Sequence, residues 1–413
     1  MTEAVILSAV RTPVGRYLGG LRDVPAYDLG AVVLNEAVRR AGLDPAEVEE
    51  VIFAQAYQSG EYVNTARMSL LKAGWPESVP GLTIHRRCCG GLDAVCQAAM
   101  KVCAGAAEVV VAGGVESMSN AEFYLPGSVK WGIGGAKGMP KGHGDLGIWG
   151  IPMFDRIQRA RVMSQPEERY GILPSMMSWA EEAARETGIA REECDRWAVE
   201  SHLKAVRAWQ EGLFADEVVP VAVPDPKGAP VSFERDEGPR GDTTLEKLAR
   251  LRPVLDGVCT AGNSSSENDG AAALVITTRE RANALGVKPF ARFVSSSVAG
   301  ADPRKTWKAV PLSVFKTLKN AGVDLASVEL IEIQEAFAAQ TLADLREMGL
   351  NAESHGRVNV NGSGISLGHP IGATGARVLV TLLHEMRRRG ARYGLETICG
   401  GGGLGIAALF ENS

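Results

Sequence analysis

The chain has 413 residues, of which 45% are hydrophobic and 23% charged, a composition typical of a globular protein with more than one domain. The formal net charge is −5, and the basic clusters at 85–87 and 387–389 are short. The sequence therefore shows no basic surface of the kind that binds nucleic acid. No apolar run reaches the roughly 18 residues of a membrane-spanning helix, so no membrane partner is expected.

The cysteine content indicates a reducing compartment. Seven cysteines occur without regular spacing, which argues against a disulfide framework. The first residues lack the basic segment and long apolar stretch of a signal peptide. A cytoplasmic location is therefore expected.

Short apolar runs alternate with helical patterns along the first part of the chain. We expect a buried strand at 4–10, an amphipathic helix at 28–42, a strand at 49–56, a helix at 91–105 and a strand at 108–114. This alternation predicts an α/β protein with layered sheets.

A weak internal repeat divides the chain. The segments 41–56 and 321–336 share Ala, Gly, Asp, Val and Glu in register, and both run from a helix end into a strand. A glycine loop, helix, strand and second glycine cluster at 88–114 recur in that order near the C-terminus. The simplest interpretation is two related α/β halves.

The region between the halves differs in composition. Residues 122–262 begin with a stretch rich in glycine, proline and aromatics and continue with helical patterns, which favours an ordered, inserted lid domain. The predicted domains are an N-terminal half at 1–121, completed by about 263–284, the lid at 122–262, and a C-terminal half at 285–413.

Two adjacent cysteines precede a predicted helix. Cys88 and Cys89 stand before Gly90 and Gly91, where unpaired N–H groups and the positive end of the helix dipole favour a thiolate with a lowered pKa. The alternative is a buried structural thiol, because free cysteine is among the most buried residue types. This local argument does not choose between the two sulfurs.

Two further residues lie in glycine-dense segments near the C-terminus. His369 stands in a loop before a helix, and a histidine elsewhere in the chain is the usual base for a nucleophilic cysteine. Cys399 precedes four glycines at 400–403, whose bare N–H groups suit an anion. The G-x-G-x-x-G match there is rejected as a dinucleotide motif, because too few residues follow it. No metal or nucleotide motif occurs, so no cofactor is expected.

Seven blocks in order resemble the thiolase family, the acyltransferases that make or split 3-ketoacyl-CoA. The blocks are "SAVRTPVGRYLGGL", "HRRCCGGLDAV", "AGGVESMSNA", "TAGNSSSENDGAAA", "QEAFAAQ", "NVNGSGISLGHPIGATGAR" and "ICGGGGLGIA". They are distributed in order over nearly the whole chain. The resemblance implies the thiolase fold, with two α-β-α layered halves and an inserted loop domain, assembled as a homodimer or homotetramer.

The resemblance also implies residue roles. Cys88 aligns with the nucleophile that becomes acylated, and Cys89 with a position usually held by glycine. His369 would activate Cys88, and Cys399 would move the proton at the Cα of acetyl-CoA. The N–H groups of Cys88 and Gly401 would form the oxyanion hole. Ser265 would contact the pantetheine arm, so that acyl-CoA and CoA are the expected substrates.

Four departures from the family pattern fall where the acyl chain and CoA are expected to bind. Gln334 replaces an asparagine that holds a water in a second oxyanion hole, and His85 replaces another asparagine. The segments 175–182 and 305–311 also differ. These changes suggest an unusual or bulkier acyl substrate, or altered contacts with CoA, in fatty acid or ketoacid metabolism. They also motivate one alternative, a non-catalytic acyl-CoA or lipid-binding subunit. A related condensing synthase is a second alternative, and Cys399 distinguishes it, because such synthases generally carry histidine or asparagine in that role.

Overall fold

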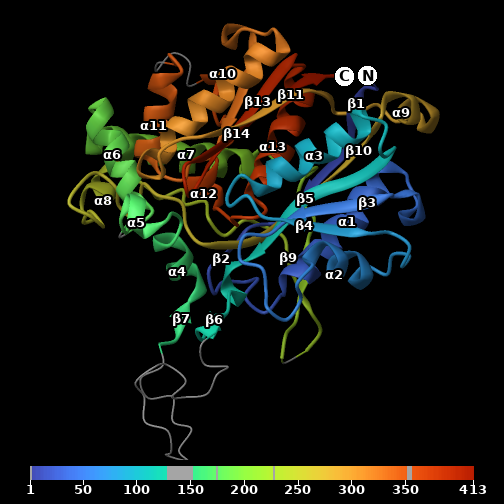
Figure 1. The fold of residues 1–413 in the computed structure, drawn as a ribbon, viewed down its shortest axis with the longest axis horizontal. Helices are drawn as coiled ribbons and strands as arrows, with labels where there is room; N and C mark the ends of the chain where they lie inside the picture. Colours follow the sequence, from blue (N-terminus) through green and yellow to red (C-terminus); the bar gives the residue numbers. More distant parts are fainter. Residues whose placement is uncertain (1, 128–151, 174, 227, 351–355) are drawn as a thin grey trace, which may run out of the picture.

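The computed structural model describes residues 2–127, 152–173, 175–226, 228–350 and 356–413. Within these residues one ten-stranded sheet runs in the order β12-β13-β14-β11-β1-β10-β5-β3-β4, with β2 paired to β10 (Figure 1). Its strands are β1 (Ala4–Arg11), β2 (Gly15–Arg16), β3 (Glu50–Ala54), β4 (Gly81–Ile84), β5 (Val109–Ser117), β10 (Asn268–Thr278), β11 (Ala291–Gly300), β12 (Leu330–Ile333), β13 (Tyr393–Gly400) and β14 (Leu404–Asn412). Two short hairpins pair β6 (Phe123–Tyr124) with β7 (Phe154–Asp155) and β8 (Val221–Val223) with β9 (Val231–Phe233).

The helices cover the sheet and build the inserted segment. They are α1 (Ala26–Ala41), α2 (Thr65–Lys72), α3 (Gly90–Cys103), α4 (Arg156–Val162), α5 (Glu167–Tyr170), α6 (Met177–Thr187), α7 (Arg191–Gln210), α8 (Leu245–Ala249), α9 (Arg279–Leu285), α10 (Ala309–Ala321), α11 (Ala338–Glu347), α12 (Gly364–Leu367) and α13 (Thr374–Arg389). The five elements predicted in the first part of the chain are all present, with ends that shift by at most three residues. For example, α1 begins two residues earlier than predicted and ends before Gly42, whose φ of 70° stops the helix.

The two halves of the sheet have the same strand pattern. In the N-terminal half, β3 is parallel to β5, and β5, β10 and β1 follow antiparallel. In the C-terminal half, β12 is parallel to β13, and β13, β14 and β11 follow antiparallel. The halves meet where β1 pairs with β11. The repeat in the sequence therefore corresponds to a repeat in the topology.

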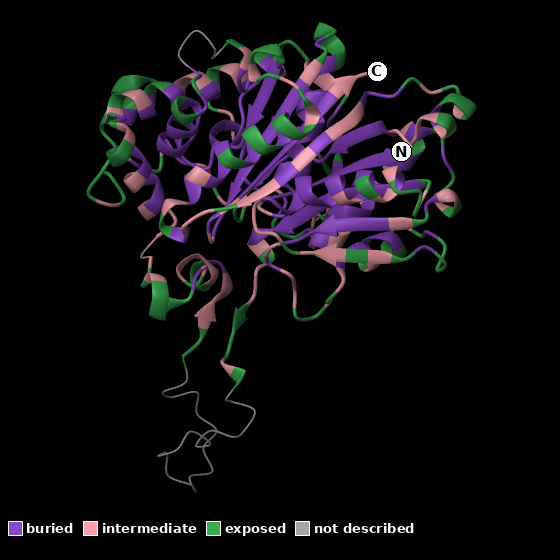
Figure 2. Ribbon diagram, turned by 45° about the horizontal axis from the view of Figure 1, so that its top comes forward, coloured by how far each residue is buried: buried purple, intermediate pink, exposed green. Residues whose placement is uncertain are grey.

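Side chains alternate between the two faces of the sheet. On β1, Ile6 joins the apolar cluster around α3 and α13, whereas Val5 and Leu7 join the cluster beneath α1 and α2. Helices α10 and α11 cover the outer face of the C-terminal half. Figure 2 shows most strands as buried, whereas β4 and β11 are largely half-buried. Each fully buried Ile or Leu contributes roughly 1.5–3 kcal/mol, so this layering holds the site's framework rigid.

Helices α3 and α13 cross closely because glycines face each other. A Cβ on Gly91 would lie 2.6 Å from the backbone nitrogen of Ala376, and one on Gly375 would lie 2.4 Å from that of Leu92. Any side chain at these glycines would therefore push the helices apart. This contact places the first turn of α3 against the start of α13.

The inserted segment packs mainly on the C-terminal half. Trp179 of α6 meets Phe337 edge to face with ring centroids 5.2 Å apart, and Trp197 of α7 donates to the Glu335 carboxylate at 3.0 Å. Of the predicted lid at 122–262, residues 128–151, 174 and 227 lie outside the described residues. None of the described helices combines the length and apolar character needed to cross a bilayer.

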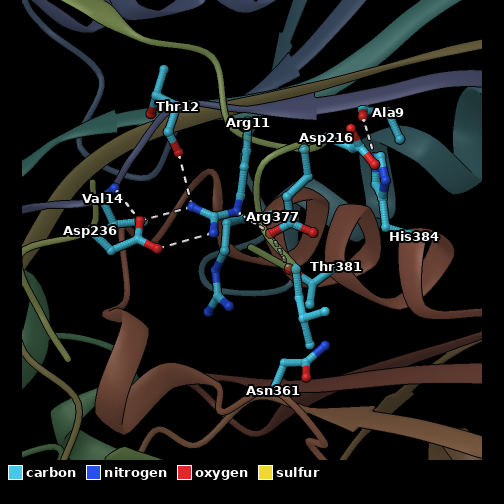
Figure 3. A network of polar contacts seen from close by, with 12 residues as sticks. Ala9, Arg11, Thr12, Val14, Asp216, Asp236, Asn361, Arg377, Thr381 and His384 are labelled. Atoms are coloured by element: carbon cyan, nitrogen blue, oxygen red, sulfur yellow. Dashed lines mark hydrogen bonds and ion pairs between the residues drawn. The ribbon is translucent and has the colours of Figure 1, made fainter. Parts of the chain in front are cut away.

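A buried ion-pair network ties the segment to β1 (Figure 3). Arg11 is fully buried, and its Nε donates to Glu217 at 2.7 Å. Its Nη1 and Nη2 donate to the two oxygens of Asp236 at 2.8 and 3.0 Å. Thr381 of α13 also donates to Glu217, at 3.0 Å. One guanidinium thus joins the central sheet, the inserted segment and α13.

Candidate active site

Cys88 lies in the tight turn between β4 and α3. Arg87 adopts a left-handed backbone with a φ of 51°, and the N–H groups of Cys89 and Gly90 donate to the carbonyls of Arg86 and Arg87 at 3.1 and 3.0 Å. The turn holds Cys88 just before the helix, while Cys89 caps it. Cys89 is fully buried in the central cluster. The structure thus separates two sulfurs that the local sequence argument left equivalent.

The backbone N–H of Gly401 lies close enough to the Cys88 sulfur to favour its thiolate. Burial nevertheless raises the pKa of the Cys88 thiol, although the Gly401 N–H, the Arg87 cation and the Cys88 N–H act in the opposite direction. The expectation of a thiol with a lowered pKa at a helix N-terminus is therefore wrong. Desolvation of the thiolate outweighs the favourable dipoles, so Cys88 needs a base to become nucleophilic.

Cys399 lies near the end of β13, and Gly401 lies in the turn that joins β13 to β14. Gly402 and Gly403 have φ of 91° and 81°, a left-handed backbone that glycine adopts without strain. Cys399 is 2% exposed, and it pairs with Gly405 across the hairpin. Burial raises the pKa of the Cys399 thiol well above its usual value, and negative charge at Cys88 acts in the same direction. The two predicted catalytic sulfurs are therefore neighbours.

His369 is held by contacts from two elements. Its backbone N–H donates to Oδ1 of Asn268 at 2.8 Å, and its Nδ1 lies 2.7 Å from Oγ1 of Thr374. The Thr374 hydroxyl donates to the carbonyl of Pro370 at 2.8 Å, so the oxygen accepts the Nδ1 proton of His369. The assigned tautomer therefore leaves the Nε2 lone pair free to act as a base.

Burial lowers the pKa of His369 to about 3, and the cations of Arg377 and Arg161 act in the same direction. The imidazole is thus neutral over the working pH range of most enzymes. Among the described residues, no hydrogen bond joins His369 to Cys88 or Cys399. Catalytic hydrogen bonds often tighten only when substrate is bound, so this separation leaves room for a reacting group.

A buried carboxylate links the loop that carries His369 to the segment that follows β3. Glu116, at the end of β5, accepts the N–H groups of Ala56 and Gly372 at 2.9 Å and that of Tyr57 at 3.2 Å. Burial raises the pKa of Glu116 to about 7. The sequence analysis missed this residue, although an acid directly after an apolar strand was a usable signal.

Gln334 is completely buried beside the same loop. Its Oε1 lies 3.4 Å from Nη2 of Arg377, and its Nε2 has no hydrogen-bond partner among the described residues. Arg377 also donates to the carbonyl of Gly368 at 3.2 Å. Arg377, which the sequence analysis also missed, therefore connects the Gln334 amide to the loop that carries His369.

Ser265 joins two loops at the edge of the site. Its hydroxyl donates to the carbonyl of Ala336 at 3.1 Å, and its backbone N–H donates to the same oxygen at 3.0 Å. The hydroxyl oxygen keeps its lone pairs for an incoming donor. The contact with pantetheine stays a prediction. In the described part of the chain, no group of three His, Cys, Asp or Glu side chains is arranged to hold a metal ion.

Comparison with known proteins places this geometry in a family. The family model for the thiolase N-terminal domain matches residues 4–280, and that for the thiolase C-terminal domain matches residues 287–412. The chain belongs to the thiolase family. The predicted family and fold are confirmed, whereas the division into three domains and the residue roles stay predictions.

Thiolase relatives of this chain match it over its full length. An acetyl-CoA acetyltransferase of Pseudomonas aeruginosa is 43% identical over 409 residues, covering 98% of each chain. One of Cupriavidus necator is 43% identical over 414 residues, covering 100% of both chains. The crystal structure of the Bacillus anthracis acetyl-CoA acetyltransferase matches with a TM-score of 0.90 and 41% identity, covering 100% of this chain and 99% of that one.

Proposed function

We propose that this thiolase transfers an acyl group between CoA thioesters through an acyl-Cys88 intermediate. The reaction is a Claisen condensation or, in reverse, CoA-dependent thiolysis of a 3-ketoacyl-CoA. The observation that carries the proposal is the position of the Cys88 sulfur, beside the Gly401 N–H and with Cys399 as a neighbour. Full-length relatives named acetyl-CoA acetyltransferase support it.

In the first step, Nε2 of His369 takes the proton of the Cys88 thiol. The sulfur attacks the thioester carbonyl, the C–S bond to CoA breaks, and CoA leaves with the proton returned by the imidazole. A neutral imidazole with a free Nε2 suits this role. The raised pKa of Cys88 makes it a strong nucleophile once the proton has moved.

In the second step, the Cys399 thiolate removes a proton from the Cα of a second acyl-CoA. The carbanion attacks the acyl carbonyl on Cys88, and the N–H groups of Cys88 and Gly401 hold the oxyanion. Collapse of the tetrahedral intermediate forms the C–C product and releases the Cys88 thiolate, which takes the proton that Cys399 removed and so regenerates the Cys399 thiolate. The raised pKa of Cys399 suits a base that must deprotonate a weak carbon acid.

Gln334 is proposed to stabilise the enolate oxygen of the second acyl-CoA. Because Arg377 engages Oε1, the unpartnered Nε2 of Gln334 is the end of the amide that can donate. The amide reaches one methylene further than the asparagine of the family pattern, so it can replace the water that the asparagine would hold.

We also propose the substrates, the assembly and the location of the enzyme. It acts on CoA and acyl-CoA without metal or redox cofactor, as a homodimer or homotetramer in the cytoplasm. The comparisons give no support to a non-catalytic subunit. Cys399 speaks against a related condensing synthase, because such enzymes generally carry histidine or asparagine in that role.

The test is an assay of acetoacetyl-CoA thiolysis and acetyl-CoA condensation, followed by a screen of short, branched and aromatic 3-ketoacyl-CoAs. The wild type is expected to catalyse both directions, and Cys88→Ala is expected to abolish both. Cys103→Ser, at the other end of α3 and half-buried, is the matched control with full activity. Turnover by Cys88→Ala at the wild-type rate would refute the proposal.

A further inference from the structure

A surface cleft lies beside the turn that holds Cys88. It has a volume of about 650 Å³. Its lining combines three guanidinium groups with an apolar and aromatic wall: Arg87, Tyr124, Arg156, Arg159, Ala160 and Met163. The mechanism proposed above uses none of these side chains. The cleft therefore needs an explanation of its own.

The cleft carries more positive than negative charge. Arg156 pairs with Glu122 at 3.1 Å. Arg159 lies over the Phe154 ring at 4.7 Å, a contact that leaves its N–H groups available. In the described part of the chain, neither Arg87 nor Arg159 forms an ion pair. Two guanidinium groups thus face the cleft without a carboxylate partner.

The positive charge of the cleft also acts on the sulfur of Cys88. Arg87 directly precedes Cys88, and its cation favours the thiolate of Cys88. Arg87 and Arg156 both act on His85, whose pKa is lowered by burial first and by these two cations next. Two of the three guanidinium groups, those of Arg87 and Arg156, therefore act on the turn that positions Cys88.

We propose, on the basis of the function proposed above, that this cleft binds the distal carboxylate of a dicarboxylic acyl group attached to CoA. The methylene chain would lie on Ala160 and Met163, and the carboxylate would accept N–H groups from Arg159 and Arg87. Arginine binds carboxylates through paired, charge-assisted hydrogen bonds, which suits this role. The phosphates of CoA are the other source of an anion, and the experiment separates the two.

The first experiment compares thiolysis of two six-carbon substrates, 3-oxoadipyl-CoA, which ends in a carboxylate, and 3-oxohexanoyl-CoA, which ends in a methyl group. The wild type is expected to prefer 3-oxoadipyl-CoA in kcat/KM. Arg159→Gln is expected to lower that preference about tenfold, the loss of one charge-assisted hydrogen bond. The matched control is Arg169→Gln, an exposed arginine over Tyr170 at 5.1 Å in the same inserted segment, which should retain the preference.

The outcomes are distinct. An equal loss on both substrates, with a raised KM for free CoA, would assign the anion to the CoA phosphates and overturn the carboxylate assignment. A wild type without preference, or equal effects of Arg159→Gln and Arg169→Gln, would also overturn it. Cleavage of 3-oxohexanoyl-CoA in those cases leaves the proposed function standing, whereas failure to cleave any 3-ketoacyl-CoA would refute the function itself.

A second experiment needs neither CoA nor turnover. Alkylation of Cys88 is measured with iodoacetate and with iodoacetamide, in which the sulfur displaces iodide from an anionic or a neutral reagent. The ratio of the two rates is expected to fall in Arg159→Gln and to stay at the wild-type value in Arg169→Gln. An unchanged ratio in Arg159→Gln would contradict an anion site at the cleft.

Discussion

The two halves of the sheet share a topology but differ at one pair of facing positions. In the N-terminal half, Ile52 of β3 faces Ala112 of β5, and both lie in the apolar central cluster. In the C-terminal half, the repeat puts Glu332 of β12 in the place of Ile52, and Glu332 faces Glu396 of β13. Both glutamates are buried, and Arg377 interacts electrostatically with both.

The difference shows how related halves take different tasks. In the N-terminal half, the apolar pair forms part of the surface on which α3, the helix that follows Cys88, packs. The buried carboxyl groups of the C-terminal half lie near Arg377, which donates to Gly368 beside His369 and to Gln334. Arg377 also lies next to the network that joins β1 to the inserted segment (Figure 3). The first half thus supplies the proposed nucleophile, and the second holds the proposed base and donor.

Loss of the proposed base, His369, should have the largest effect on activity. His369→Gln removes the free Nε2, so the rate of Cys88 acylation should fall by about a hundredfold to ten-thousandfold. Stopped-flow measurement of CoA release from acetyl-CoA gives this rate directly. Near-wild-type acylation by the variant would show that the C-terminal half does not activate Cys88.

A variant of Arg11, which anchors the inserted segment to β1, shows how far the stability of the N-terminal half depends on buried ion pairs. Arg11→Met leaves Glu217 and Asp236 buried without their cation, so the free energy of unfolding should fall by about 3–5 kcal/mol. Denaturant unfolding measures this loss. Arg22→Met removes an exposed pair with Asp23 and should change stability by less than about 1 kcal/mol. Equal effects of the two variants would disprove the anchoring role.

Making the C-terminal half resemble the N-terminal half should stabilise the protein. Both carboxyl oxygens of Glu396 are buried without a hydrogen-bond partner among the residues that the structure describes, so Glu396→Leu should raise the free energy of unfolding by about 1–3 kcal/mol. Burial raises the pKa of Glu396 well above its usual value. The folded wild-type protein therefore keeps the Glu396 proton over a pH range in which the unfolded chain releases it, so the wild-type protein loses stability as pH rises. The stability advantage of Glu396→Leu should accordingly grow between pH 5 and pH 8. An advantage that shrinks with pH would contradict the protonated state.

The smallest effect concerns the protonation of the nucleophile. Because burial raises the pKa of Cys88, the rate of its alkylation by iodoacetamide should still be rising with pH at the ordinary thiol pKa of about 8.5, and it should level off only at higher pH. With the pKa of His369 at about 3, no step near pH 6.5 is expected. A step near pH 6.5 that disappears in His369→Gln would instead indicate a thiolate–imidazolium pair.

Periodicity and motifs predicted the helices and strands of the first half and the family, because those signals are local. They did not predict the raised pKa of Cys88, which results from burial under the β13–β14 turn more than three hundred residues away. The partners of Arg11 and the three N–H donors of Glu116 were equally invisible, because they come together only in the folded chain. Long-range burial therefore accounts for most of what the sequence analysis missed.

The most direct test of the two-sulfur division is peptide mapping of Cys399→Ala after incubation with acetyl-CoA. The account predicts a single acetyl group on the peptide that contains Cys88, together with loss of acetoacetyl-CoA formation. Retained condensation by Cys399→Ala, or an acetyl group on a cysteine other than Cys88, would contradict it.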